Sequence, residues 1–376
     1  KPYQVIDTMV NEISLLKINK QLKRQVQESK KIVADQLKGV SDVMDNFAKE
    51  IMKERREHEK QEIQIIRALK QLDIQLEKLE IYQLEKGNID IEMSIIFYDY
   101  HGEGSKLIAP VLSDILGEPI VVVEEEISPF PNGVSFLTFS SAKQFVVETG
   151  VATAAKGGGL ISGDSYTMME LGKGKYALAI SDGMGNGLRA REESMETLRL
   201  LKQILQTGIS EQVAIKSINS ILSLRTTDEI FATLDLAIIN LHDATLRSLK
   251  IGSSPSFIKR GREVIQIAAN NLPIGIIEHV ELETVTEQLQ AGDLLIMMSD
   301  GIFEGPKHVI NNDLWLHRKI KDMKTDDPQE IADLLLEEVI RSEMGVIRDD
   351  MTVVVAKVKR HRPKWATFSV FQSEAK

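Results

Sequence analysis

The stretch from Lys175 to Gly187 constrains the fold more than any other part of the chain. Its first six residues, Lys-Tyr-Ala-Leu-Ala-Ile, are mostly apolar and strand-forming, and they lead through Ser181 to the carboxylate of Asp182. Alternating glycines follow, and a helix is predicted from about Leu188. A buried strand that ends in an aspartate beside glycines is a common way to hold a cation. Glycines in this spacing between a strand and a helix also resemble a dinucleotide loop, so both interpretations stay open at this point.

The bulk properties exclude several classes of protein. At 376 residues the chain is long enough for two domains. Its net charge of −10 argues against a nucleic-acid partner, and the absence of cysteine excludes disulfides, thiolate catalysis and cysteine zinc sites. No apolar run approaches the ~18 residues of a membrane span. The chain starts with Lys1, so we expect a fragment excised from a longer protein.

The first 86 residues have a helical pattern. Between Pro2 and Lys86 there is one glycine, Gly39, and no further proline. One heptad seam is formed by Leu22, Val26, Val33, Leu37, Val40, Met44, Phe47 and Ile51, and a second by Ile65, Leu69, Leu72, Leu76 and Leu79. We predict two long amphipathic helices, which pack within their own domain or self-associate.

From Ile89 the hydrophobic period changes to that of a small mixed α/β element. Strands are predicted from Ile89, over 120–123 and over 134–139, and a helix over 105–116 is closed by Gly117. We place a boundary near 140–145. The chain then divides into a helical regulatory or dimerisation domain that includes this element (1–142), a second domain (143–360) and a tail (361–376).

Two aspartates are predicted to meet at one sheet edge. The strand that opens at Tyr166 pairs naturally with the strand from Lys175 through the turn Gly172-Lys-Gly174. In such a hairpin Asp164 and Asp182 emerge at the same end. Two converging carboxylates repel each other unless a cation lies between them.

Two further acidic turns strengthen the case for a metal. Gly292 to Gly301 repeats the plan of an apolar strand followed by Ser-Asp-Gly, with Asp300 as the acid, and Asp349 precedes a last strand over 353–358. Four acidic turns at strand ends make a bowl of oxygen ligands, which selects Mg²⁺ or Mn²⁺ over zinc. Two such ions, typically ~3.5–4 Å apart, can hold a water for in-line attack on phosphorus.

Five short motifs together carry a family resemblance. The motifs are Gly163-Asp164, Asp182-Gly-Met-Gly, Leu272-Pro-Ile-Gly275, Ser299-Asp300-Gly301 and Asp349-Asp350-Met-Thr. In order and roughly in spacing, they resemble the motifs of the metal-dependent serine/threonine phosphatases of the PPM class, most closely their bacterial sporulation and stress-response branch. The resemblance covers about 145–359.

The resemblance implies an α/β fold, an α-β-β-α sandwich of two antiparallel sheets flanked by helices, preceded by a long-helix regulatory domain. It implies that Asp182 bridges two Mn²⁺ or Mg²⁺ ions with help from the Gly183 carbonyl. Asp164 and Asp300 would ligate on either side, and Asp349 would complete the second ion site. A metal-bound water would attack phosphoserine directly, with no catalytic side chain beyond it.

The resemblance also implies partners and a location. The substrate would be a phosphorylated anti-anti-sigma factor, whose dephosphorylation activates a sporulation sigma factor. A homodimer through the helical leader is expected, with no nucleic acid. This fragment has no membrane span and would be cytoplasmic. The intact protein would be tethered upstream of Lys1, at the inner face of the cell membrane or at the division septum.

Alternatives come from other classes of protein. A dinucleotide-binding enzyme would need a β-α-β pattern around the glycines, and this sequence lacks that pattern. A catalytically silent phosphatase-like scaffold that binds partners through its helices remains the alternative, although all four acidic positions are intact. The helix after Gly187 grows directly from the metal loop. We therefore expect the amino-terminal helical domain to press on residues 188–224 and gate metal occupancy.

Overall fold

The structure is a computed structural model. It describes residues 58–84, 86–171, 174–183, 187–207, 209, 211–225, 232–268 and 284–361, with scattered positions between 38 and 52. Most of the first predicted helical seam, the Leu272-Pro-Ile-Gly275 motif and the tail beyond His361 lie outside these residues.

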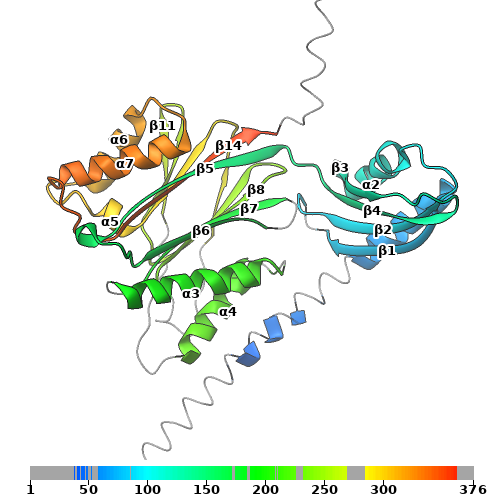
Figure 1. Cartoon of the computed structure of the whole chain (residues 1–376), viewed down its shortest axis with the longest axis horizontal. Coiled ribbons are helices and arrows are strands. Elements are labelled where there is room, and N and C mark those ends of the chain that lie inside the picture. The colour runs from blue at the N-terminus through cyan, green and yellow to red at the C-terminus, as the bar shows by residue number, and fades with distance from the viewer. Residues whose placement is uncertain are drawn as a thin grey trace, which may run out of the picture.

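The amino-terminal unit is a four-stranded antiparallel sheet covered on one face by helices (Figure 1). Residues 58–71 are helical, and Ile65 and Leu69 on this helix are buried against the sheet residues Met93 and Phe139. The elements, with the sheet order β1-β2-β4-β3, are β1 (Gln75–Gln83), β2 (Asp90–Phe97), η1 (Gly104–Ile108), α2 (Ala109–Leu116), β3 (Ile120–Glu126) and β4 (Gly133–Ser141). The predicted helix over 105–116 and its closure by Gly117, which has a φ of 71°, are confirmed.

The second predicted seam is wrong in its later half, because the helix ends at residue 71 and Leu76 and Leu79 lie on strand β1. A β-bulge at Glu77 explains the error. Leu76 lies opposite Ile95 and Leu79 opposite Met93, so the extra residue turns both leucines to the same face of the sheet. Without a bulge, residues three apart on a strand face opposite sides. The bulge therefore gives a strand the apolar spacing of a helix.

The carboxy-terminal unit is a sandwich of two five-stranded antiparallel sheets. One sheet has the order β11-β10-β13-β14-β5 and the other β12-β9-β8-β7-β6. The strands are β5 (Phe145–Ala154), β6 (Asp164–Leu171), β7 (Lys175–Asp182), β8 (Leu234–Asn240), β9 (Thr245–Ile251), β10 (Ser256–Arg260), β11 (Glu263–Ile267), β12 (Thr284–Gln288), β13 (Leu294–Met298) and β14 (Met351–Arg360). The helices are α3 (Leu188–Leu205), α4 (Glu211–Arg225), α5 (Asp300–Phe303), α6 (Asn312–Asp322) and α7 (Pro328–Ser342).

Three apolar cores define four layers. One core joins α3 and α4 to the β6–β9 sheet, a second fills the space between the sheets, and a third joins α5, α6 and α7 to the β5–β14 sheet. Figure 1 shows α3 and α4 on one outer face and α6 and α7 on the other. The predicted α-β-β-α order is therefore present. Strands β11 and β12 and helix α6 were not predicted, because their short, mixed segments have little periodicity.

The two units meet at the end of the sandwich where the β6–β7 hairpin turns. The amide of Asn240 donates to the Lys86 carbonyl at 3.3 Å across this junction. Within the amino-terminal unit, the Gly87 N–H donates to the buried Glu118 carboxylate at 2.8 Å and so holds the junction segment in place. Gly174 packs so tightly against Gly87 that a Cβ on it would lie 1.8 Å from the Gly87 carbonyl oxygen. This junction lies at the start of β7, the strand that ends at Asp182.

Candidate metal centre

The β6–β7 hairpin brings two of the predicted ligands together. Leu171 pairs with Lys175 next to the turn, and Asp164 pairs with Asp182 at the other end of the hairpin. Two hydrogen bonds with Thr233, which precedes the neighbouring strand β8, hold the main chain of Asp182. Its N–H donates to the Thr233 hydroxyl at 3.1 Å, and its carbonyl accepts from the Thr233 N–H at 3.0 Å. The expected convergence of Asp164 and Asp182 is therefore built into the sheet register.

The other two acidic turns come from the second sheet. Asp300 is the first residue of α5, directly after β13, and Asp349 lies in the loop before β14. These two strand ends are joined because the Ser299 N–H donates to the Thr352 carbonyl at 3.0 Å and the Thr352 N–H donates to the Ser299 hydroxyl at 2.9 Å. Each sheet of the sandwich thus supplies two carboxylates at one end of the molecule.

Two motif glycines are needed for close packing of these segments. A Cβ on Gly183 would lie 1.9 Å from the Ala190 carbonyl oxygen on α3, and a Cβ on Gly301 would lie 1.9 Å from the Asp350 carbonyl oxygen. Both contacts are with backbone atoms, which cannot move aside as a flexible side chain can. The glycine after each aspartate therefore lets one acidic segment pack directly on its neighbour.

The carboxylates act on one another electrostatically. Burial, followed by the charges of Asp164, Asp300 and Asp349, raises the pKa of Asp182 to about 8. Burial, followed by the charges of Asp349 and Asp164, raises the pKa of Asp300 to about 6. Burial also raises the pKa of Asp164, an effect that the nearby Ser299 and Thr352 hydroxyls partly offset. All three carboxyl groups resist ionisation in the absence of a positive charge.

These residues fit a hard divalent cation. Both carboxylate oxygens of Asp164 are buried without a partner in hydrogen-bonding geometry, which is costly unless another group binds them. Within the described part of the chain, no group of three or more acidic or histidine side chains is placed so that all of them could hold one metal ion. Mg²⁺ does not need such a group, because it keeps several waters and takes only one or two carboxylates. A cation with an incomplete protein shell is consistent with both observations.

Asp350 has a role that the sequence did not reveal. One of its carboxylate oxygens accepts from the Lys156 N–H at 2.8 Å and the other from the Gly163 N–H at 2.7 Å. It therefore ties down the loop that leads into Asp164. Its neighbour Asp349 lies close enough to Asp182 and Asp300 to raise their pKa values, and the charge of Asp350 itself contributes, after burial, to the raised pKa of Asp164. Two adjacent aspartates give no sequence signal that separates these roles.

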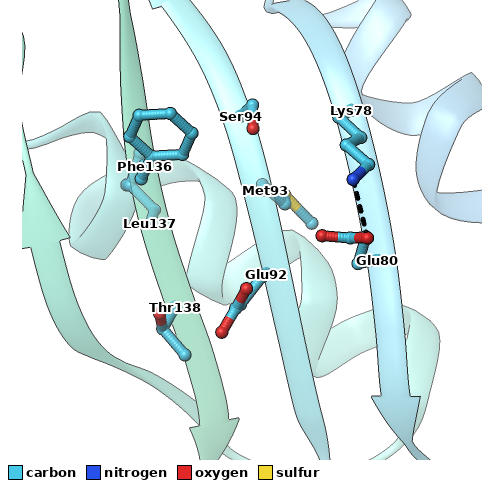
Figure 2. A pocket seen from close by; sticks show the side chains of 8 residues that line it. All are labelled: Lys78, Glu80, Glu92, Met93, Ser94, Phe136, Leu137 and Thr138. Atoms are coloured by element: carbon cyan, nitrogen blue, oxygen red, sulfur yellow. Dashed lines mark ion pairs between the residues drawn. The ribbon is translucent and has the colours of Figure 1, made fainter.

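A pocket away from the acidic cluster lies on the sheet of the amino-terminal unit (Figure 2). It contains an ion pair of 2.7 Å between Lys78 and Glu80 and none of the predicted site residues. Its lining residues are Lys78, Glu80, Glu92, Met93, Ser94, Phe136, Leu137 and Thr138.

Among the helices that the structure describes, none is long and apolar enough to cross a membrane.

Comparison with known families decides what this arrangement is. The SpoIIE regulatory domain family matches residues 1–141, and the family described as stage II sporulation protein E (SpoIIE) matches residues 172–359. The chain belongs to the SpoIIE family. This membership confirms the predicted resemblance to the sporulation branch of the PPM class.

Two curated members of the SpoIIE family are similar along nearly the whole chain. The stage II sporulation protein E of Priestia megaterium is 61% identical over 367 residues, which cover 98% of this chain and 63% of that protein. The protein of the same name from Bacillus subtilis (strain 168) is 60% identical over 370 residues, which cover 98% of this chain and 45% of that protein. The chain therefore spans about half to two-thirds of the length of these relatives.

A solved structure matches both units. It comprises the PP2C phosphatase domain and a fragment of the regulatory domain of the cell fate determinant SpoIIE from Bacillus subtilis. The TM-score is 0.78 at 62% sequence identity, covering 90% of this chain and 100% of that one. The similarity confirms the predicted α/β sandwich of PPM type, preceded by a regulatory domain.

Proposed function

We propose that this chain is a metal-dependent protein serine phosphatase that hydrolyses the phosphoserine of a phosphoprotein. The observation that carries the proposal is the convergence of Asp164 and Asp182, paired in one sheet, with Asp300 and Asp349 from the other. Four carboxylates that repel one another at the end of a PP2C-type sandwich support a divalent cation centre.

The four carboxylates and the Gly183 carbonyl are the proposed ligands of two ions, Mn²⁺ or Mg²⁺. When bound, such ions supply Lewis-acid activation of a water and of the phosphoryl group. Asp182, with the Gly183 carbonyl, would hold both ions, Asp164 and Asp300 would ligate on either side, and Asp349 would complete the second site. We assign no side chain as a further catalytic group.

A metal titration tests this function. Mn²⁺ added to the metal-free chain is expected to restore phosphate release from a phosphoserine peptide in proportion to occupancy, and a chelator is expected to abolish it, because the carboxylates alone cannot activate water. Phosphate release is measured in parallel with calorimetric Mn²⁺ binding. Binding without release from any phosphoserine substrate would support the silent scaffold instead, and absence of binding would refute the centre itself.

Domain organisation and partners follow from the same proposal. We assign residues 1–142 to regulation and dimerisation, 143–360 to catalysis and 361–376 to a tail. Membership of the SpoIIE family supports a phosphorylated anti-anti-sigma protein as substrate and a homodimer as the assembly. It also supports a membrane tether upstream of Lys1, with the intact protein at the inner face of the cell membrane or at the division septum.

We also propose that the amino-terminal domain gates metal occupancy through α3 and α4. Helix α3 contacts the residues next to two candidate ligands, Asp164 and Asp182. The Ser194 hydroxyl donates to the Gly163 carbonyl at 2.6 Å and lies 2.7 Å from the Ser165 hydroxyl, and Ala190 packs on Gly183. A displacement of α3 would therefore move the backbone beside both Asp164 and Asp182.

Truncation tests the gate. A chain of residues 143–376 is expected to differ from the whole chain in Mn²⁺ affinity and in the rate of phosphate release, because it lacks the domain that we propose to press on α3 and α4. Circular dichroism of both chains serves as the control for folding. Equal affinities and equal rates in two folded chains would show that the amino-terminal domain exerts no control.

A further inference from the structure

We propose that Asp235 is a positioning residue of the metal centre, which holds a water that hydrates the bound ion. The inference rests on the proposed function, because it concerns the same centre. It adds a residue on β8 that belongs to none of the four acidic turns, together with Ser253 from the turn between β9 and β10.

The strand register brings Asp235 close to Asp182. Asp235 pairs with Ile180 on β7, two residues before Asp182, and with Lys250 on β9. Its side chain is only 1% exposed, as is that of Lys250. A buried ion pair thus lies directly behind the strand end that carries the central aspartate.

One oxygen of Asp235 is fully occupied by structural contacts. Its Oδ2 accepts from the Lys250 ammonium at 2.6 Å and from the Ser256 hydroxyl at 2.9 Å. Lys250 also donates to the Ser254 carbonyl at 2.8 Å. Because β8 and β9 belong to one sheet and Ser256 to the other, these bonds fix the carboxylate across the sandwich.

The other oxygen has no protein partner. Asp235 Oδ1 and the Ser253 hydroxyl are both buried without a hydrogen bond in the described structure. Both residues line a small cavity that Asp182 and Asp300 also line. A buried carboxylate oxygen without a donor is unfavourable, so this position fits a bound donor.

The chemistry of the cavity selects water over an anion or a side chain. The cavity has a volume of about 20 Å³, which is enough for about one water. The wall includes three carboxylates, which would repel a phosphate. A water can donate to Asp235 Oδ1 and to the Ser253 hydroxyl while its oxygen faces the cation. Such outer contacts orient metal-bound groups and strengthen binding of the ion.

Direct binding of Mn²⁺ to the full chain tests this inference, with calorimetry as the readout. Asp235→Asn is expected to raise the dissociation constant for Mn²⁺ about 10- to 100-fold. Ser253→Ala removes a hydroxyl that has no protein partner and is expected to raise it about 3- to 10-fold. Asp293→Asn is the matched control, because Asp293 is a buried acid paired with Arg260 at the opposite end of β13. It is expected to lower the melting temperature and leave the dissociation constant unchanged.

An unchanged dissociation constant in Asp235→Asn would overturn the inference, and so would equal weakening in Asp293→Asn. If Asp235→Asn does not fold, Ser253→Ala decides, and an unchanged constant there overturns the inference. Failure of the proposed function gives a different result. In that case the parent chain would not bind Mn²⁺, or its binding would persist in Asp182→Ala. Either result would overturn both proposals together.

Discussion

Replacing Asp182 with Ala is expected to lower Mn²⁺-dependent phosphate release by about 10³-fold or more. The reason is that Lewis-acid activation contributes several kcal/mol to the transition state, and each 1.36 kcal/mol corresponds to a factor of ten in rate. The charges of Asp164, Asp300 and Asp349 all raise the pKa of Asp182, so Asp182 lies at the centre of the four carboxylates. Its replacement removes that centre. The measurement is phosphate release from a phosphoserine peptide at saturating Mn²⁺.

Asp350→Ala provides the contrasting variant. Asp350 accepts hydrogen bonds from the Lys156 and Gly163 backbone N–H groups, and the Gly163 donor is buried. Loss of Asp350 is therefore expected to destabilise the fold by roughly 1–3 kcal/mol for the buried donor left unpaired. Asp182→Ala removes a buried carboxyl group whose ionisation is unfavourable in the folded state, and is expected to keep or raise the melting temperature of the metal-free chain. Retained activity in a folded Asp182→Ala variant would refute the assigned centre.

Without metal, the chain is expected to lose stability as the pH rises from about 4 to about 8. Burial, and next the charge of Asp164, raises the pKa of Asp182 from 3.8 to about 8, so between these values the folded state binds a proton that the unfolded state has released. The free energy of unfolding then falls with rising pH, because its slope follows the protons bound in the unfolded state minus those bound in the folded state. The loss is on the order of a few kcal/mol, and Asp300, with a pKa raised to about 6, acts in the same direction.

Thermal unfolding in a chelating buffer between pH 5 and pH 8.5 measures this slope. Asp182→Asn cannot ionise at that position and is expected to flatten the profile, and saturating Mn²⁺ is expected to do the same by neutralising the cluster. A profile that is equally steep in the parent chain and in Asp182→Asn would assign the pH dependence to other groups.

Much of the candidate site was predictable because it rests on local patterns. Apolar strands that end in Asp-Gly fixed the expected positions of Asp182 and Asp300, and the short turn between β6 and β7 implied that Asp164 lies opposite Asp182, as the register shows. The helix predicted from about Leu188 is confirmed, because α3 begins at that residue. These features depend on neighbours a few residues apart, which a sequence displays directly.

The errors arose where distant contacts override local periodicity. Leu76 and Leu79 have helical spacing, yet pairing with β2 across a bulge makes them part of a strand. Asp349 and Asp350 are adjacent and chemically identical, and only the packing of the Lys156–Gly163 loop binds one of them to backbone N–H groups.

By itself the sequence predicted four acidic strand ends whose carboxylates converge, and its five motifs carried the resemblance to the PPM class that implied the sandwich. Only the tertiary structure decided which carboxylates lie close enough to raise one another's pKa. It also placed Asp235 behind Asp182, with one carboxylate oxygen bound by Lys250 and the other without a partner among the described residues. The physical reason is that a carboxylate's role depends on the charges, donors and burial around it. Those neighbours come from strands far apart in the chain, and only packing of the two sheets brings them together.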